Sequence, residues 1–200
     1  ASQLTLDRFA DAEKGFREAA RLLALDPKAP ESRQAWIKNG LGSALWGLGR
    51  LDEARRELTE AHRIALRTLG PEHEIVGLTL LNLGIIDQRE GRAGEAQEQL
   101  EAARAIYAKL NHPQLARVDL ERGVARLALS RDQEAERILA AVLDGFVARP
   151  HDRSEVRFRA MAALGLAQAR LGGGKDAASL AREGLAELEK SGQAVSDDYA

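Results

Sequence analysis

The sequence predicts an all-α protein, and three observations lead to that prediction. Its 200 residues are rich in Ala, Leu, Glu, Arg and Gln, whereas aromatic residues make up only 4%. This balance favours helices throughout the chain. Glycine and alanine also recur in one frame at a period of 39 to 42 residues. Each recurring segment reads as two amphipathic helices joined by a tight turn.

The frame is clearest when LGSALWGLGRLDEARREL, residues 41–58, is compared with LGIIDQREGRAGEAQEQL, residues 83–100. These copies match at a spacing of 42, and two further copies follow at spacings of 39 and 42. Because a mid-helix glycine costs about 1 kcal/mol relative to alanine, glycines in register indicate close helix contacts. We expect such contacts between the two helices of each copy, with Gly42, Gly84, Gly123 and Gly165 facing Ala54, Ala96, Ala135 and Ala177.

The frame divides the chain into nine helices in order. They are expected near residues 9–24, 33–48, 52–68, 74–89, 93–109, 113–129, 132–147, 154–171 and 175–190. An acidic residue precedes the frame alanine of every second helix, and a carboxylate in the first turn complements the positive end of the helix dipole. These acids predict five helix starts, at Asp11, Glu53, Glu95, Glu134 and Asp176.

The same frame predicts the domain organisation. We expect one array over residues 1–190 and a flexible tail at 191–200. The array comprises a leading half-repeat, 1–30, and four full repeats, near 31–71, 72–111, 112–151 and 152–190. Only the end of a first helix, SQLTL, remains in the half-repeat. Since a repeat cannot bury its apolar face alone, this end is expected to stack against something else.

The pattern resembles the tetratricopeptide repeat, whose consensus places Leu-Gly, an aromatic residue, a Gly turn, Ala, Phe and Ala at these offsets. Its period exceeds the usual 34 residues. With LNLG at residues 81–84 and the LG-x-x-H turn, it looks like the kinesin light chain variety. The resemblance covers roughly residues 5–190 and implies a right-handed superhelical solenoid of stacked antiparallel helix pairs. Similar bacterial arrays are appended to serine/threonine kinases or signalling ATPases.

Composition excludes several partner classes. The formal net charge of −2 argues against nucleic-acid binding, because proteins that bind nucleic acid usually carry an excess of basic residues. The chain has no cysteine, and no apolar run is long enough to span a membrane. We therefore expect a cytoplasmic protein without nucleic-acid or membrane partners. Arg outnumbers Lys by 23 to 6, which favours a GC-rich bacterial source.

No catalytic site, metal site or cofactor is predicted. Three histidines in turns, His73, His112 and His151, are spaced by 39 residues. Equivalent positions in neighbouring repeats lie at least about 8–10 Å apart, whereas zinc–imidazole bonds are about 2 Å. These residues are interpreted as polar turn residues near helix starts. LGGGKD, residues 171–176, lacks the spacing of a phosphate loop and falls at an inter-helix turn.

Binding is expected on the concave groove lined by first helices, as the resemblance implies. Counting from the repeat glycine places a mixed aromatic, amide and cationic set there: Trp36, Asn39, Ser43, Trp46, Leu78, Asn82, Ile85, Arg89, Arg117 and Arg159. Gly40 and Gly47 fall on the same surface. Trp and Arg are enriched at binding hot spots, and Asn amides can hold a peptide main chain. Trp36 and Trp46 could instead fill the interior.

The residues on this surface also bear on the kind of ligand. Family members that clamp a chaperone's carboxylate use Lys, Asn and Arg at fixed positions, and only Asn82 matches here. That clamp is therefore not expected. Second helices carry the mixed charges of solvated surfaces, so Arg55 is expected to lie on such a surface.

The predicted function is a non-enzymatic module that binds a protein or peptide within a larger bacterial signalling protein. One alternative is a regulatory domain that senses a small molecule or peptide and controls an attached effector. Another is self-association, forming a homo-oligomer through the exposed amino-terminal end.

Overall fold

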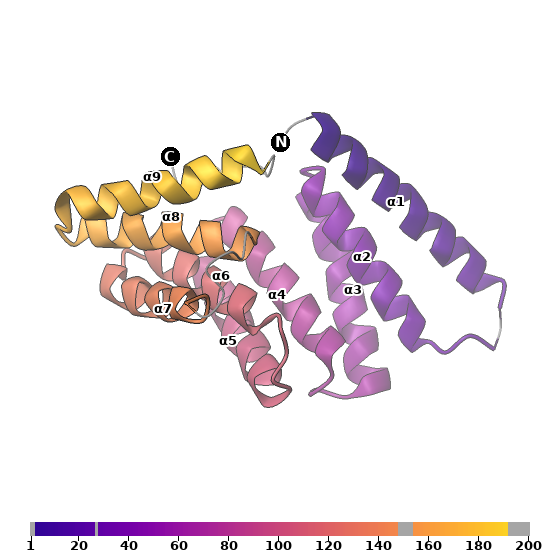
Figure 1. Cartoon of the computed structure of the whole chain (residues 1–200). Coiled ribbons are helices and arrows are strands. Elements are labelled where there is room, and N and C mark those ends of the chain that lie inside the picture. Colours follow the sequence, from indigo (N-terminus) through magenta and orange to yellow (C-terminus); the bar gives the residue numbers. More distant parts are fainter. Residues whose placement is uncertain (1–2, 27, 148–153, 192–200) are drawn as a thin grey trace. The chain divides into compact units, whose positions relative to one another are not determined.

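The computed structural model describes residues 3–26, 28–147 and 154–191, and these residues form nine α-helices and no strand (Figure 1). The helices are α1 (Gln3–Ala24), α2 (Ser32–Gly47), α3 (Leu51–Leu69), α4 (Glu74–Arg89), α5 (Ala93–Lys109), α6 (Leu115–Ala128), α7 (Asp132–Asp144), α8 (Glu155–Arg170) and α9 (Gly174–Lys190). The predicted all-α class is confirmed, and the expected bounds hold to within a few residues for α2–α9.

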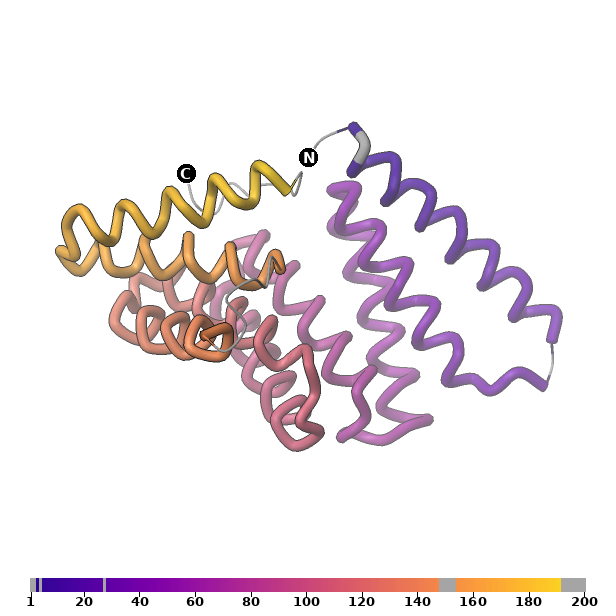
Figure 2. Tube along the Cα trace, viewed as in Figure 1, coloured from indigo at the N-terminus to yellow at the C-terminus, as the bar shows by residue number. Residues whose placement is uncertain are grey.

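Contacts divide the chain into an amino-terminal unit, residues 3–112, and a carboxy-terminal unit, which begins at residue 113. In the first unit α2 pairs with α3 and α4 with α5, while α1 packs on α2 and α3 on α4. Figure 2 follows α1, α2 and α3 as successive antiparallel helices. In the second unit α6 pairs with α7 and α8 with α9, and α7 packs on α8. Each unit is thus a stack of helix hairpins.

The frame glycines are the close-contact points within each hairpin, as predicted. A Cβ added to Gly42 would lie 2.6 Å from the Leu58 side chain, and one added to Gly84 would lie 2.9 Å from the Leu100 side chain. The main-chain oxygens of Ala54 and Ala96 also lie within 3.4 Å of these positions. Gly123 and Gly165 are crowded in the same way by the second helix of their own hairpins. Glycine therefore sets the separation of the paired helices.

The joint between α1 and α2 uses a different pair of glycines. The ring of Phe16 lies over Gly40 and the ring of Phe9 lies over Gly47, both close enough to exclude a Cβ. The two aromatic residues and the two glycines are each seven residues apart, so each pair occupies one side of its helix. The prediction that Gly40 and Gly47 lie on the binding surface is wrong, because the rings of α1 cover them.

Helix α1 differs from its prediction in a second way. It begins at Gln3, so residues 3–6 of the SQLTL segment belong to the second helix instead of ending a separate first helix. Asp11 lies in the middle of α1, and its prediction as a helix start is wrong. The other four acids lie in the first turns of α3, α5, α7 and α9, as expected: Glu53, Glu95, Glu134 and Asp176.

The repeat boundaries and the single array over residues 1–190 stay predictions, because each unit is described by itself. The proposed tail at 191–200 lies outside the described residues except for Ser191, and His151 lies outside them entirely. Among the described helices, none is both long and apolar enough to cross a membrane.

Candidate functional site

The face that the sequence predicts for binding contains a cluster of polar side chains shared by α2 and α4. The amide Nδ2 of Asn82 donates to Asn39 Oδ1 at 3.0 Å and to Ser43 Oγ at 3.2 Å. The Ser43 hydroxyl donates in turn to the Asn39 carbonyl oxygen at 3.0 Å. Three of the predicted site residues, drawn from two successive hairpins, are therefore joined by hydrogen bonds.

The pattern of bonds in this cluster leaves a defined set of polar atoms for a ligand. An asparagine amide offers two N–H donors and one carbonyl acceptor. Asn82 uses its nitrogen and Asn39 uses its oxygen, so within the described part of the chain the Asn82 Oδ1 acceptor and the Asn39 Nδ2 donors have no protein partner. A peptide group presents the complementary N–H and C=O. Asn39 is only 6% exposed and Asn82 is half-buried, so a main chain would meet these atoms only at the joint between α2 and α4.

Two tryptophans flank this cluster on α2, and the structure places them differently. Trp36 is 43% exposed, whereas Trp46 is half-buried and packs with Phe16 against the core around Leu41 and Leu45. Helical spacing puts Trp36 on the same side of α2 as Asn39. Trp36 is therefore an available aromatic anchor, while Trp46 contributes mainly to packing.

The remaining apolar candidates on α4 belong largely to the core. Ile85 is only 8% exposed, and Leu78 is half-buried against Ala35, Ile64 and Val76. Neither is a main contact surface in this conformation. The exposed part of the candidate face thus consists of Trp36 on α2 and Arg89 near the end of α4, while the amide cluster between them is more enclosed, with Asn39 only 6% exposed and Asn82 half-buried.

The other two predicted cations, Arg117 and Arg159, lie in the carboxy-terminal unit. Arg159 Nη1 and Nη2 donate to the two carboxylate oxygens of buried Glu121, at 2.7 and 3.2 Å. The Arg159 side chain is 16% exposed and that of Glu121 is 2% exposed. Arg159 therefore neutralises a buried carboxylate, which the residue frame could not show. Arg117 and Arg159 therefore belong to a different unit from the face on α2 and α4.

A groove lies on the opposite side of α2. It is lined by Ala20, Leu23 and Ala24 of α1, by Gln34, Ile37, Lys38 and Leu41 of α2, and by Glu57 of α3. At 100° per residue, its α2 residues point away from Trp36 and Asn39. The Lys38 ammonium lies 2.9 Å from the Glu57 carboxylate, so an ion pair and the Gln34 amide accompany the apolar residues of the lining.

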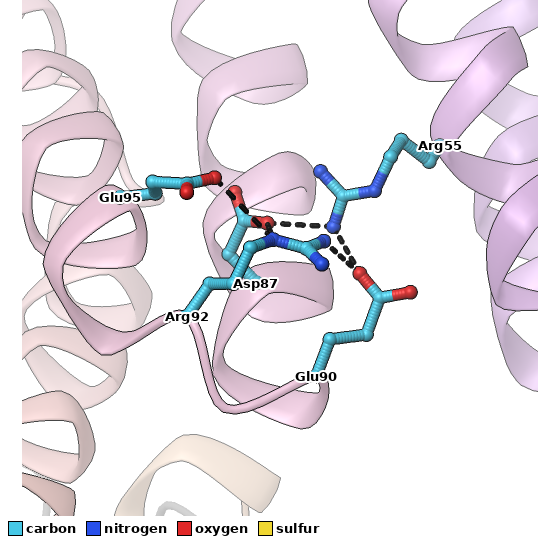
Figure 3. Close-up of polar contacts among 5 residues, drawn as sticks. All are labelled: Arg55, Asp87, Glu90, Arg92 and Glu95. Carbon is cyan, nitrogen blue, oxygen red and sulfur yellow. Dashed lines mark hydrogen bonds and ion pairs between the residues drawn. The ribbon is translucent and has the colours of Figure 1, made fainter.

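A buried ion-pair network joins α3 to the next hairpin, and sequence reasoning missed it (Figure 3). Asp87 is fully buried, and its Oδ1 accepts from Arg55 Nη2 at 2.6 Å and from Arg92 Nε at 2.8 Å. Both arginines also pair with Glu90. The expectation that Arg55 lies on a solvated surface is wrong. One signal was available, because Asp87 interrupts the apolar run LNLGII of a first helix.

Burial shifts the titration of two residues at the joint between α3 and α4. Burial raises the pKa of the Asp87 carboxyl above its ordinary value, and the positive charge of Arg55 opposes that rise. Burial also lowers the pKa of His62. His62 Nδ1 lies 2.8 Å from Thr79 Oγ1, and the Thr79 hydroxyl already donates its proton to the Val76 carbonyl oxygen. The His62 Nδ1 is therefore the donor in this pair.

The turn histidines have structural contacts. His73 is the N-cap of α4, where its Nδ1 accepts from the Ile75 amide at 3.2 Å. His112 follows α5, stacks on the Tyr107 ring at 4.6 Å between centroids, and lies 3.3 Å from the Glu74 carboxylate. The interpretation of His73 as a polar residue at a helix start is confirmed. No group of three or more metal-ligating side chains occurs among the described residues.

Comparison with protein families bears on the amino-terminal unit. Residues 33–109, which contain α2–α5 except for the first residue of α2, match the family model of the tetratricopeptide repeat. The matched segment is similar to tetratricopeptide repeats. No curated protein sequence matches the chain. The matched segment comprises the two hairpins that hold Asn39 and Asn82.

Solved structures with the same fold include a protein described as a kinesin light chain. A Podosopora anserina protein described as a kinesin light chain with nearly identical TPR-like repeats is 22% identical, with a TM-score of 0.69 over 93% of this chain and 89% of that one. BtubC (BKLC) from P. vanneervenii is 17% identical, with a TM-score of 0.75 over 95% and 77% of the two chains.

A third similar structure contains a bound peptide. The Rap conjugation gene regulator of the plasmid pLS20, in complex with the Phr* peptide, is 15% identical, with a TM-score of 0.73 over 93% of this chain. This chain spans 50% of that regulator. At these identities the likeness shows the fold alone. The fold is one that serves as a scaffold for protein interactions.

Proposed function

We propose that this chain is a non-enzymatic interaction module that binds an extended or helical peptide segment of a partner protein over α2 and α4. The observation that carries the proposal is the linked pair Asn39 and Asn82, which leaves one amide acceptor and one amide donor group for a peptide main chain. Exposed Trp36 lies on the same side of α2 and offers an aromatic anchor. Arg89 favours a ligand with acidic character.

Repeat architecture supports the proposed binding mode. First helices of successive repeats line one surface of such arrays, which suits an elongated ligand. The peptide in the similar Rap regulator is consistent with this class of ligand. We further propose that the module works in the bacterial cytoplasm as part of a larger signalling protein, with the arginine-rich composition as the supporting observation.

The test is a peptide selected from a random displayed library on the purified 200-residue chain and then titrated against variants. Trp36→Ala should weaken binding about thirtyfold, because a hot-spot aromatic residue contributes about 2 kcal/mol. Arg89→Glu should weaken binding of an acidic peptide and leave the helical content unchanged.

The matched control for the charge reversal is Arg56→Glu. Arg56 is exposed on α3, whereas Arg55 is unsuitable because it neutralises buried Asp87. Equal losses with Arg89→Glu and Arg56→Glu would indicate general electrostatics and contradict the proposed face. Unchanged binding by both Trp36→Ala and Arg89→Glu would refute it.

A further inference from the structure

The leading helix α1 occupies the same place in the repeat frame as α3 and α5, at spacings of 42 and 84 residues. Within the full repeats, the matching face of the second helix is covered by the first helix of its own hairpin. On α3 the covered residues are Ala54, Leu58, Ala61 and Ile64, which are at most 1% exposed. On α5 they include Ala96, Leu100 and Ala103, all fully buried.

The same face of α1 is uncovered. Leu22 is 52% exposed, although its counterpart Ile64 is 1% exposed. Ala12, Phe16 and Ala19 are only half-buried, in contrast to their fully buried counterparts. A Cβ added to Gly15 would meet no atom within 4 Å, so open space lies over the middle of this face. We name Ala12, Gly15, Ala19 and Leu22 the α1 face.

The two covered faces show what chemistry fits this surface. In each full hairpin a glycine of the covering helix, Gly42 or Gly84, lies against the leucine that corresponds to Phe16. Large side chains are excluded at that point, and apolar residues on either side complete the contact. The α1 face also continues the hairpin stack, because Phe9 and Phe16 already hold α1 against α2 on its neighbouring side.

We propose that the α1 face binds an amphipathic α-helix with a small central residue, in the arrangement that α2 adopts on α3. The occupant is a partner helix of the first-helix type, with Gly or Ala over Phe16 and apolar residues toward Ala19 and Leu22. This surface is distinct from the proposed peptide face on α2 and α4. The proposal therefore stands or falls independently of the proposed function.

The test uses a fluorescein-labelled peptide that copies residues 73–90 and the intact 200-residue chain, with fluorescence anisotropy as the readout. Leu22→Asp places a charge in the contact and should weaken binding at least about tenfold, the loss expected for one buried leucine. Leu25→Asp is the matched control. Leu25 is 68% exposed, and its counterpart in the full repeat, Arg67, is also exposed.

One variant of the peptide and one further variant of the chain serve as independent checks of the same contact. A peptide with Gly84→Leu should also bind at least about tenfold more weakly, because the added side chain overpacks the contact. Gly15→Glu in the chain fills open space without disturbing α1 and should block binding if Leu22→Asp proves unstable. Equal binding by the wild type, Leu22→Asp and Gly15→Glu would overturn the proposal. A dimer seen in sedimentation equilibrium, lost in Leu22→Asp and unaffected by the peptide, would make a second copy the occupant and also overturn it.

Discussion

Arg55→Met should destabilise the amino-terminal unit, because it removes one of the two cations that neutralise Asp87. Methionine retains most of the side-chain stem and so limits the loss of packing. Breaking a buried ion pair costs about 3–5 kcal/mol when it leaves an uncompensated charge. The substitution leaves the second cation in place, since Arg92 Nε lies 2.8 Å from Asp87 Oδ1 in the wild type. We therefore expect a smaller loss, about 1–3 kcal/mol in the free energy of unfolding.

The pH dependence of that loss tests its cause. Burial already raises the pKa of Asp87, and removal of Arg55 removes an opposing charge, so the pKa rises further. The folded variant then binds a proton at a higher pH than the unfolded chain does. Relative to the wild type, the variant gains stability as the pH falls toward the ordinary pKa of an aspartate. The difference between the two proteins should shrink between about pH 7 and about pH 4.5.

The assay is urea unfolding followed by far-ultraviolet circular dichroism at both pH values. Arg56→Met is the control, since Arg56 is exposed on the same helix and should cost less than about 0.5 kcal/mol. Equal stability of Arg55→Met and the wild type at neutral pH would refute the claim that Asp87 depends on Arg55. A difference that stays constant with pH would show that lost packing, not charge, is the cause.

Three other outcomes follow from the described contacts. Gly84→Leu should lower the free energy of unfolding by about 1–3 kcal/mol through overpacking. Gly94→Leu is the control and should leave the free energy of unfolding unchanged, because open space surrounds that position. Equal melting temperatures of the two variants would contradict the assigned hairpin contact. Because the pKa of His62 is lowered, the free energy of unfolding should fall as the pH drops below about 6.5. His62→Gln should reduce this pH dependence. If the variant shows the same pH dependence as the wild type, His62 is not its cause. Replacing His73, His112 and His151 together by alanine should leave the zinc content unchanged. The loss of the His73 N-cap should cost about 1 kcal/mol of stability. Stoichiometric zinc in the wild type that disappears in the variant would reveal a metal site formed by these histidines.

Periodicity predicted the hairpins because each one buries the same face at the same frame position. Gly84 and Leu100 meet in one hairpin as Gly42 and Leu58 do in another, so one copy explains the next. The contact between α1 and α2 does not repeat in this way. Phe16 packs on Gly40 of the following helix, a contact that the frame of a single repeat does not contain.

The candidate face was predictable in part for the same reason. Counting from the repeat glycine placed Asn39 and Asn82 on facing first helices, and the structure joins them. Arg55 and Arg159 are instead held by buried acids, Asp87 and Glu121, each of which occurs in one repeat only. Pairings between unlike residues across a joint have no period, so sequence reasoning assigned both arginines to exposed surfaces.

Photocrosslinking tests the proposed peptide face most directly. Benzoylphenylalanine can replace Trp36 on α2 or Leu66 on α3, two positions with similar exposures of 43% and 40%. With the library-selected peptide bound, irradiation followed by mass spectrometry should show peptide crosslinked at position 36 and not at position 66. Crosslinks at position 66 alone would place the peptide on the second helices and contradict the account.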